Sequence, residues 1–244
     1  MCSLVPLSLP EVLATADLQT RTDRKYIVGP DLLAALLAEL GAGMGVLEID
    51  GAQAFRYESV YFDTPARDSY LGAAYGRRRR FKVRTRAYVD SGDCMLEVKV
   101  RTGRGETEKH RVAYDAGRRW ALDGAGLNFV RQHAPVPPGA ALAPALTTTY
   151  QRRTFVELAT GARLTCDTGL VCASPDGPAV SLPGDCLVET KSAGPPTGAD
   201  RFLWRAGVRP AAISKFCVGM AALDPALPAN KWNRILGQHF HGGL

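Results

Sequence analysis

Several signatures that would point to a function at once are missing from this sequence of 244 residues. The six cysteines form no CxxC pair and no metal-ligand spacing, so the simplest interpretation is scattered reduced thiols in a cytoplasmic protein. The glycine-rich segment 41–51 is not followed by the Gly-Lys-Ser/Thr of a phosphate-binding loop. The four histidines are isolated, and no set of Ser, His and Asp or of Cys and His predicts nucleophilic catalysis.

Membrane and export signals are absent as well. No apolar run approaches the ~20 residues that span a bilayer. The N-terminus lacks the basic and apolar regions of a signal peptide. We therefore expect no transmembrane segment, while a membrane partner stays open. The net charge of +6 is compatible with nucleic acid, an acidic membrane surface or a phosphate-rich ligand, and it does not choose among them.

What the sequence does contain is a repeated alternation of charged and apolar residues. It is clearest at 82–86 (KVRTR) and 96–100 (LEVKV), where strict period 2 predicts β-strands. The pattern recurs around Lys25, Lys109, Arg152, Arg163 and Glu189. Each strand alone is explained by a solvated charged face. Recurrence across so many strands favours a second interpretation, a closed barrel whose charged faces line a polar lumen, with helices outside.

Cations outnumber acids on these predicted faces. The cations are Arg21, Lys25, Lys82, Arg84, Arg86, Lys99, Lys109, Arg111, Arg152, Arg163 and Lys191, and the acids are Asp23, Glu97, Asp167 and Glu189. A sheet face so rich in one charge repels itself unless an anion binds to it. The predicted ligand is therefore a polyanion, most simply a row of phosphates. Arg77 to Arg80 is either a basic edge, open to nucleic acid, or partly a continuation of the row, since Arg78 and Arg80 share the parity of Lys82.

Other segments predict the surrounding elements. Leucines at helical spacing after Pro30 predict a helix that ends at Gly41, and segment 41–51 predicts a connector. We also predict strands near 57–63, 146–158, 162–170 and 186–191, and helices over 118–133 and 214–223. Asn230 is expected to cap a last helix.

A series of motifs, in order and in approximate spacing, resembles the VTC domain. This is the polyphosphate polymerase branch of the triphosphate tunnel metalloenzymes, which is related to the CYTH proteins. The motifs are RTDRKY at 21–26, SVYFDT at 59–64, KVRTRAY at 82–88, LEVK at 96–99, YQR at 150–152, RLTCD at 163–167, VETK at 188–191 and SKF at 214–216. The resemblance implies an α+β fold with a closed eight-stranded antiparallel barrel, or tunnel, over residues 20–223. Residues 1–19 would be a lead-in and 224–244 a C-terminal helix or tail.

The resemblance also implies an activity, namely transfer of the ATP γ-phosphate onto a growing polyphosphate chain with the help of Mn²⁺ or Mg²⁺. The partners would be ATP and polyphosphate, with no specific nucleic acid. The implied catalytic phosphate ligands are Lys25, Arg84, Arg86, Lys99, Arg152 and Arg163. The implied substrate-binding residues are Tyr150, Ser214, Lys215 and a further cation at either Lys109 or Arg111. From the charged faces we add Lys82 and Lys191 as substrate-binding residues. Glu189 matches the metal ligand.

Two positions depart from the family pattern, and several functions stay open from the residues alone. Asp23 stands where a glutamate is usual, and Ala212 stands where the eukaryotic polymerases carry a lysine. Glu97 and Asp167 either bind Mg²⁺ or Mn²⁺ or pair with the surrounding arginines. The alternatives to a polymerase are a metal-dependent tri- or polyphosphate hydrolase that uses Glu97 or Asp23, and a non-catalytic binder of polyphosphate or inositol phosphates. The presence of Glu189 favours catalysis, and the oligomeric state is not indicated.

Overall fold

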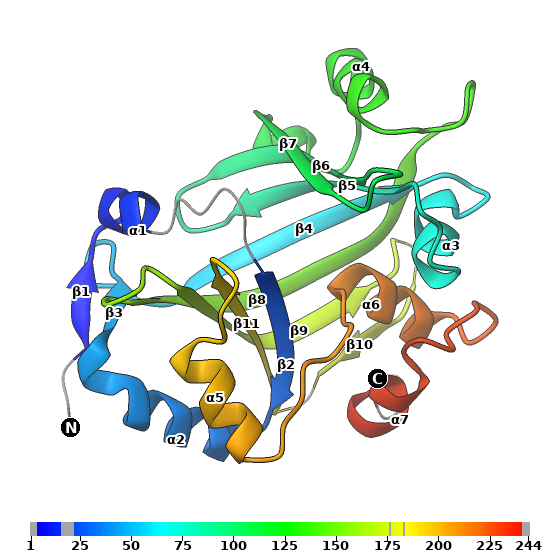
Figure 1. Ribbon diagram of the computed structural model, residues 1–244. Coiled ribbons are helices and arrows are strands. Elements are labelled where there is room, and N and C mark those ends of the chain that lie inside the picture. Colours follow the sequence, from blue (N-terminus) through cyan, green and yellow to red (C-terminus); the bar gives the residue numbers. More distant parts are fainter. Residues whose placement is uncertain (1–3, 16–21, 176, 183, 241–244) are drawn as a thin grey trace. The chain divides into compact units, whose positions relative to one another are not determined.

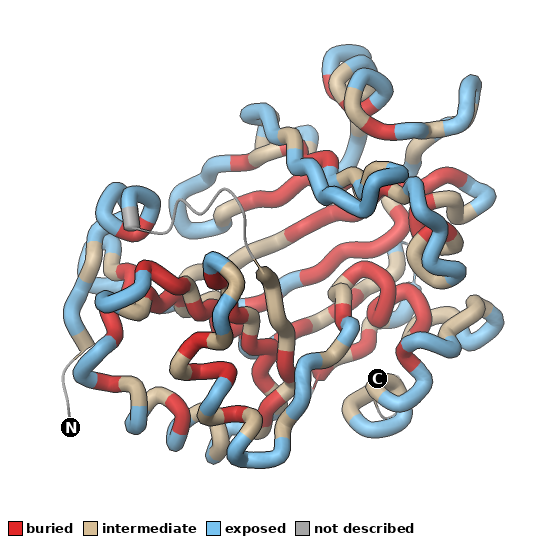
Figure 2. The backbone as a smooth tube through the Cα atoms, viewed as in Figure 1, coloured by how far each residue is buried: buried red, intermediate tan, exposed pale blue. Residues whose placement is uncertain are grey.

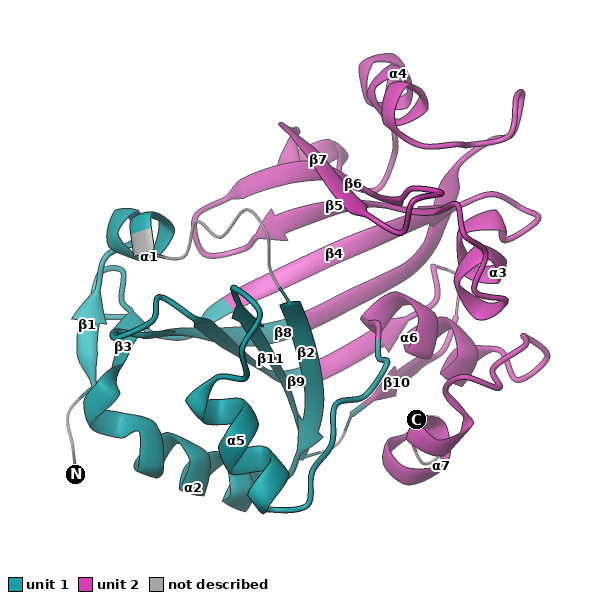
Figure 3. Ribbon diagram, viewed as in Figure 1, with its two compact units in different colours: residues 1–55, 150–169, 182–213 teal, residues 56–149, 170–181, 214–244 magenta. Residues whose placement is uncertain are grey.

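The computed structural model describes residues 4–15, 22–175, 177–182 and 184–240 (Figure 1). The chain forms two compact units (Figure 3). Unit 1 comprises residues 1–55, 150–169 and 182–213, and unit 2 comprises residues 56–149, 170–181 and 214–244. Two long strands, β8 (Ala143–Glu157) and β9 (Arg163–Ala173), contribute to both units. Arg21, which we counted among the cations of the predicted charged faces, lies outside the described residues.

Unit 1 is built on antiparallel strands in the order β2–β11–β9–β8. Its other elements are β1 (Val5–Leu7), α1 (Leu9–Thr15), β2 (Thr22–Val28), α2 (Pro30–Leu40), a 3-10 turn (Gly41–Gly43), β3 (Met44–Leu47), β11 (Cys186–Ser192) and α5 (Gly198–Arg205). One face of the strands is apolar and packs on the helices, burying Tyr26 and Val188 with Leu36 of α2 and Leu203 of α5. The alternation therefore leaves Lys25 and Glu189 on the other face.

Segment 41–51, which we predicted to be a connector, contains a strand. Strand β3 pairs in parallel with β1 and antiparallel with β8. All of its residues are buried. Because neither face of β3 is polar, the sequence carries no period-2 signal there.

A buried carboxylate fixes the apolar face of unit 1. Asp200 of α5 is fully buried and accepts hydrogen bonds from Tyr26 Oη at 2.6 Å and from Thr190 Oγ1 at 2.7 Å. Arg24 Nη1 lies 3.4 Å from its other oxygen. Burial and the bond to Asp200 raise the pKa of Tyr26 far above its ordinary value, so Tyr26 remains a donor. The network ties α5 to β2 and β11, the strands that carry Lys25 and Glu189 on their opposite face.

Unit 2 is built on antiparallel strands in the order β4–β5–β6–β7. Its elements are β4 (Phe55–Asp63), α3 (Asp68–Ala74), β5 (Arg80–Tyr88), β6 (Asp93–Arg101), β7 (Thr107–Ala113), a 3-10 turn (Ala116–Arg118), α4 (Gly124–His133), β10 (Ala179–Ser181), α6 (Lys215–Leu223) and α7 (Asn233–His239). The apolar face of β4, β5 and β6 packs on α4, and Phe62, Val83, Leu96 and Val130 are buried between them. The α+β class and the antiparallel pairing are confirmed, while closure of a barrel stays a prediction.

Two predicted helices of unit 2 begin later than expected. Helix α4 starts at Gly124 rather than 118, because the Asp123 side chain accepts a hydrogen bond from Gly126 N at 2.7 Å and caps the helix there. Helix α7 starts at Asn233, with Trp232 rather than Asn230 at its N-cap position. Among the described residues, none of the helices combines the length and the apolar character needed to cross a membrane.

Helix α6 begins at the predicted Ser-Lys motif and is buried along most of its length (Figure 2). Ser214 caps it by accepting from Cys217 N at 3.5 Å. Phe216 stacks on Tyr61 with ring centroids 5.1 Å apart. A Cβ atom at Gly219 would lie 2.8 Å from Cys172 Sγ, so only glycine lets the helix pack this closely. The motif therefore holds Ser214 and Lys215 at a rigid helix start.

Candidate functional site

A row of lysines crosses the charged face of unit 2. The register places Lys82 of β5 opposite Lys99 of β6, and Lys99 opposite Lys109 of β7. Residues directly opposite one another have Cβ atoms about 4.5–5.5 Å apart, so like charges at these positions repel. Lys82 Nζ donates to Ser214 Oγ at 2.7 Å, which orients the ammonium group but supplies no negative charge. In the lysine row (Lys82, Lys99 and Lys109), Glu97 pairs with Lys109, and a bound anion would lower the repulsion that remains.

The next row along these strands is centred on a buried carboxylate. Glu97 is 2% exposed, and its Oε2 accepts from Arg84 Nε at 2.7 Å. Lys109 Nζ lies 2.5 Å from its other oxygen. Burial alone would raise the pKa of Glu97, but the charges on Arg84, Arg86 and Lys109 outweigh it and hold that pKa far below its usual range. Glu97 therefore carries its negative charge near neutral pH and pairs with Arg84 and Lys109, while its alternative role as a metal ligand stays a prediction.

Two residues of β4 that the motif analysis did not single out orient the arginines of this face. Arg84 Nη1 donates to Tyr61 Oη at 2.9 Å, and Arg86 Nε donates to Ser59 Oγ at 3.3 Å. Tyr61 and Ser59 stand opposite Arg84 and Arg86 in register. The sequence signal for these two residues was their period-2 spacing within the SVYFDT motif. Their contacts with the arginines could not be predicted without the register of β4 on β5. Arg111 is exposed and lies opposite Glu97 on β7.

The charged face of unit 1 holds a glutamate between two lysines. Glu189 of β11 stands opposite Lys25 of β2, and Lys25 Nζ lies 3.3 Å from Glu189 Oε1. Lys191 Nζ lies 3.3 Å from the same oxygen. Lys191 in turn stands between Asp23 and Arg163 in register. The Glu189 side chain is 16% exposed, so it is paired but still accessible.

A bidentate ion pair fixes Arg152 on the same face. Arg152 Nε and Nη2 donate to the two oxygens of Asp167 at 2.6 and 2.7 Å. The guanidinium carbon lies 5.4 Å from the centroid of the Tyr150 ring. Burial would lower the pKa of Arg152, but Asp167 outweighs it and holds the pKa well above its ordinary value. Asp167, which is 2% exposed, thus acts as a counter-ion that positions Arg152.

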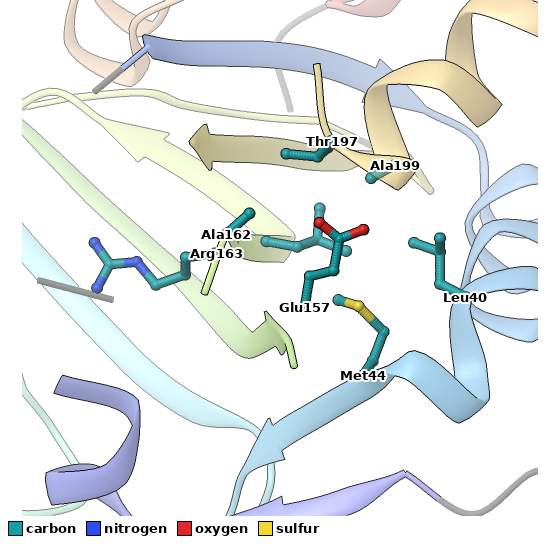
Figure 4. A pocket seen from close by; sticks show the side chains of 8 residues that line it. Leu40, Met44, Glu157, Ala162, Arg163, Thr197 and Ala199 are labelled. Atoms are coloured by element: carbon teal, nitrogen blue, oxygen red, sulfur yellow. The ribbon is translucent and has the colours of Figure 1, made fainter. Parts of the chain in front are cut away.

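The pocket beside Arg163 lies on the core side of unit 1 (Figure 4). Its walls include Leu40, Met44 and Leu164, and Glu157 points into it. The Arg163 side chain extends away from Glu157 (Figure 4). Glu157 is engaged by the backbone of Gly198, whose N lies 3.3 Å from Oε1. We therefore do not assign the pocket to the charged face.

Each predicted site residue lies on one of the two charged faces or at the start of α6. The residues of unit 1 are Lys25, Tyr150, Arg152, Arg163, Glu189 and Lys191. The residues of unit 2 are Lys82, Arg84, Arg86, Lys99, Lys109, Arg111, Ser214 and Lys215. Register and contacts bring these residues together within each unit, except that Lys215 is placed only by its position at the start of α6.

Comparisons with known proteins bear on the family and on the fold. A family model described as the VTC domain matches residues 20–224. A solved structure from Hippeastrum, described as an adenylyl cyclase with a dominant triphosphatase activity, is similar with a TM-score of 0.54 and 17% identity, covering 82% of this chain and 94% of that chain. At this identity, the likeness shows a shared fold.

Two other solved structures are similar at lower scores. A structure from Vibrio parahaemolyticus that is described as an adenylate cyclase has a TM-score of 0.43 and 12% identity, covering 78% of this chain and 87% of that one. The PH1819 protein from Pyrococcus horikoshii OT3 has a TM-score of 0.46 and 10% identity, covering 81% and 95%. The comparison of this chain with curated proteins found no match.

The tunnel proteins to which this family is related generally use a divalent metal ion, and the acids of unit 1 can be tested against that requirement. Within the described ranges, no group of three or more His, Cys, Asp and Glu residues forms a protein-only metal cage. A magnesium ion usually needs only one or two carboxylates, because substrate phosphates and water complete its shell. Glu189 fits this requirement since it is accessible, and Asp23 stands diagonal to it on β2. Asp167 fits less well because Arg152 engages both of its oxygens.

We expect Glu97→Gln to lower the free energy of unfolding by about 3 kcal/mol or more near pH 7, since it leaves Arg84 without its buried anion. The folded pKa of Glu97 lies below the ordinary 4.5, so the stability that it contributes is complete above that pH and declines as the pH falls further. The difference between wild type and variant should therefore shrink in acid. Urea unfolding at a series of pH values measures it.

The matched control is Glu106→Gln, which changes an exposed glutamate just before β7. It should shift the free energy of unfolding by no more than ~0.5 kcal/mol at any pH. A Glu97→Gln protein as stable as wild type at neutral pH would contradict the assignment of Glu97 as the buried anion.

Proposed function

The chain belongs to the VTC-domain family, and on this premise we propose that it is a polyphosphate polymerase that transfers the γ-phosphate of ATP to the end of a polyphosphate chain. The lysine row is the observation that carries the proposal. Three cations stand in register across three strands, one of them (Lys109) paired with Glu97, and a chain with a negative charge on every phosphate can contact them together. Family membership supports tri- or polyphosphate chemistry, and the row favours a linear polyanion as the ligand.

The proposed reaction needs position and counter-charge more than covalent help from the protein. The bond from the γ-phosphorus to the oxygen that bridges it to the β-phosphate breaks, and ADP leaves with that oxygen. A terminal oxygen of the chain forms the new bond. The transition state spreads charge over the equatorial oxygens, and one well-placed donor is worth about 3–4 kcal/mol. Arg84 and Arg152 suit this task because Glu97 and Asp167 hold their planar guanidinium groups in place.

The acceptor removes the need for a general base. A polyphosphate end is already an anion at neutral pH and can attack directly. Hydrolysis, by contrast, requires activated water, and Glu97 is a weak base because its pKa is held far below the usual range. The triphosphatase activity reported for the Hippeastrum protein nevertheless makes a tri- or polyphosphate hydrolase the second candidate. Asp23 is then the remaining candidate to activate water.

Glu189 distinguishes a catalyst from a mere binder of phosphates. A binding surface needs the cations but has no use for an accessible acid among them. We propose that Glu189, with Asp23 near it, holds Mn²⁺ or Mg²⁺. When bound, the ion would neutralise charge on the phosphate oxygens. Lys25 and Lys191 would then be free to turn from Glu189 toward phosphate.

We expect purified protein to convert ATP, in the presence of Mn²⁺, into ADP and a long anionic polymer that acid hydrolyses. Gel electrophoresis with a polyphosphate stain detects the polymer, and chromatography measures ADP. If ATP yields only orthophosphate and ADP, the hydrolase replaces the polymerase. If ATP is not turned over but polyphosphate binds, the non-catalytic binder replaces both.

We expect Glu189→Gln to reduce polymer synthesis by roughly 10²-fold or more, the scale of losing one transition-state contact. The amide is a poor ligand for a hard cation, while the cations that bind polyphosphate remain. Affinity for polyphosphate in the presence of a chelator should therefore be kept. Turnover is measured across a Mn²⁺ titration, and affinity by fluorescence anisotropy.

The control for this variant is Glu39→Gln, which changes an exposed, ion-paired glutamate on α2. It should leave both turnover and affinity unchanged. Near-normal turnover of Glu189→Gln at ordinary Mn²⁺, together with tighter polyphosphate binding, would instead show that Glu189 only balances Lys25 and Lys191.

A further inference from the structure

A cluster of arginines, all of them exposed except the half-buried Arg80, lies at one end of the charged face of unit 2. We call it the arginine patch and define it as Arg77, Arg78, Arg79, Arg80, Arg101 and Arg104. The first three are exposed and lie in the turn before β5, and Arg80 is the first residue of that strand. Arg101 ends β6, and Arg104 lies in the turn that leads to β7.

The two segments of the arginine patch lie against each other. Arg80 stands opposite Arg101 in the register of β5 and β6. A Cβ atom at Gly103 would lie 3.6 Å from Arg79 Nε, which places the turn after β6 beside the segment before β5. Burial and the charge of Arg101 both lower the pKa of Arg80. The geometry therefore gathers like charges from segments about twenty residues apart in the chain.

Nearby acids do not compensate this cluster. Within the described part of the chain, none of the ion pairs involves an arginine of the patch. Glu108 on β7 lies 3.3 Å from His110, and Glu106 is exposed in the turn. A surface with so many exposed cations and so few acids is suited to a polyanion.

The arginine patch continues the row of cations of the candidate site. Arg80 lies on the same face of β5 as Lys82, and Arg101 lies on the same face of β6 as Lys99. Successive residues on one face of a strand are about 6.8 Å apart. The pair Arg80 and Arg101 is thus the next row after the lysine row, and Arg77 to Arg79 extend it beyond the strand end.

We propose that the arginine patch binds the part of a long polyphosphate chain that extends past the lysine row. This inference rests on the proposed function and adds that the protein prefers long chains to short ones. Continuity with the lysine row favours polyphosphate over single-stranded nucleic acid. Nucleic acid would need aromatic side chains between the cations on which bases stack, whereas the arginines are consecutive and Tyr75 is the exposed aromatic beside them.

The test is the triple variant Arg77→Gln, Arg78→Gln and Arg79→Gln. We expect its affinity for long polyphosphate to fall by at least about tenfold at low salt, with a shallower salt dependence, because it makes fewer phosphate contacts. Its affinity for tripolyphosphate should stay within about twofold of wild type. Fluorescence anisotropy against both ligands over a salt series measures this. The matched control changes the exposed Arg131, Arg209 and Arg234 to Gln and should affect neither ligand.

Each other outcome overturns the proposal. If the triple variant binds the long chain with unchanged affinity, or loses affinity equally for both ligands, the arginine patch is not a separate binding site for the long chain. If the control variant loses as much affinity for long polyphosphate as the triple variant does, the loss is a general effect of net charge. If wild type binds single-stranded DNA of matched charge as tightly as long polyphosphate, and the triple variant loses both, the patch is a nucleic-acid surface. Polymer synthesis by wild type is measured in parallel, so that failure of the polymerase proposal is seen separately from failure of the patch.

Discussion

Repulsion between cations on one face of a sheet is the constraint on which the structure depends. Buried acids balance this repulsion at some positions. Glu97 pairs with both Arg84 and Lys109, and Asp167 pairs with Arg152. Packing on the other face keeps the strands together, through the apolar cores of both units and the Asp200 network of unit 1. In the lysine row, which stands in register across three strands, Glu97 pairs with Lys109, and Lys82 donates to the uncharged Ser214. The positive charge of Lys82 can therefore favour a bound anion.

The acids fall into two physical classes, and the difference bears on function. Glu97 and Asp167 are almost fully buried and hold their arginines through short contacts. Removing either acid would leave a buried arginine without its counter-ion, which is costly in folding free energy. Glu189 is more accessible and shares one oxygen between Lys25 and Lys191 at 3.3 Å. A phosphate can draw those lysines away, which makes Glu189 the acid best suited to change partners during a reaction.

The sequence alone predicted which residues share a face of a strand, because alternate residues of a β-strand lie on the same face whichever strand pairs with it. It placed Lys82 with Arg84 and Glu97 with Lys99 correctly. It could not predict that Lys82 stands opposite Lys99 or that Tyr61 meets Arg84, since both depend on how strands align. Strand β3 escaped prediction because it is buried on both faces. The closure of the barrel, inferred from the recurring charged faces and from the family resemblance, and the roles of the site residues stay predictions.

The central claim is that the lysine row is a phosphate site, and Lys82→Met tests it most directly. Thermal unfolding is measured with and without tripolyphosphate, at low and high salt. We predict that ligand raises the Tm of wild type in a salt-sensitive way. Without ligand, the variant should be at least as stable as wild type, because its repulsion with Lys99 falls and Ser214 still caps α6. With tripolyphosphate, its Tm should rise much less than the Tm of wild type. A variant that is less stable and gains as much from tripolyphosphate as wild type would contradict the account.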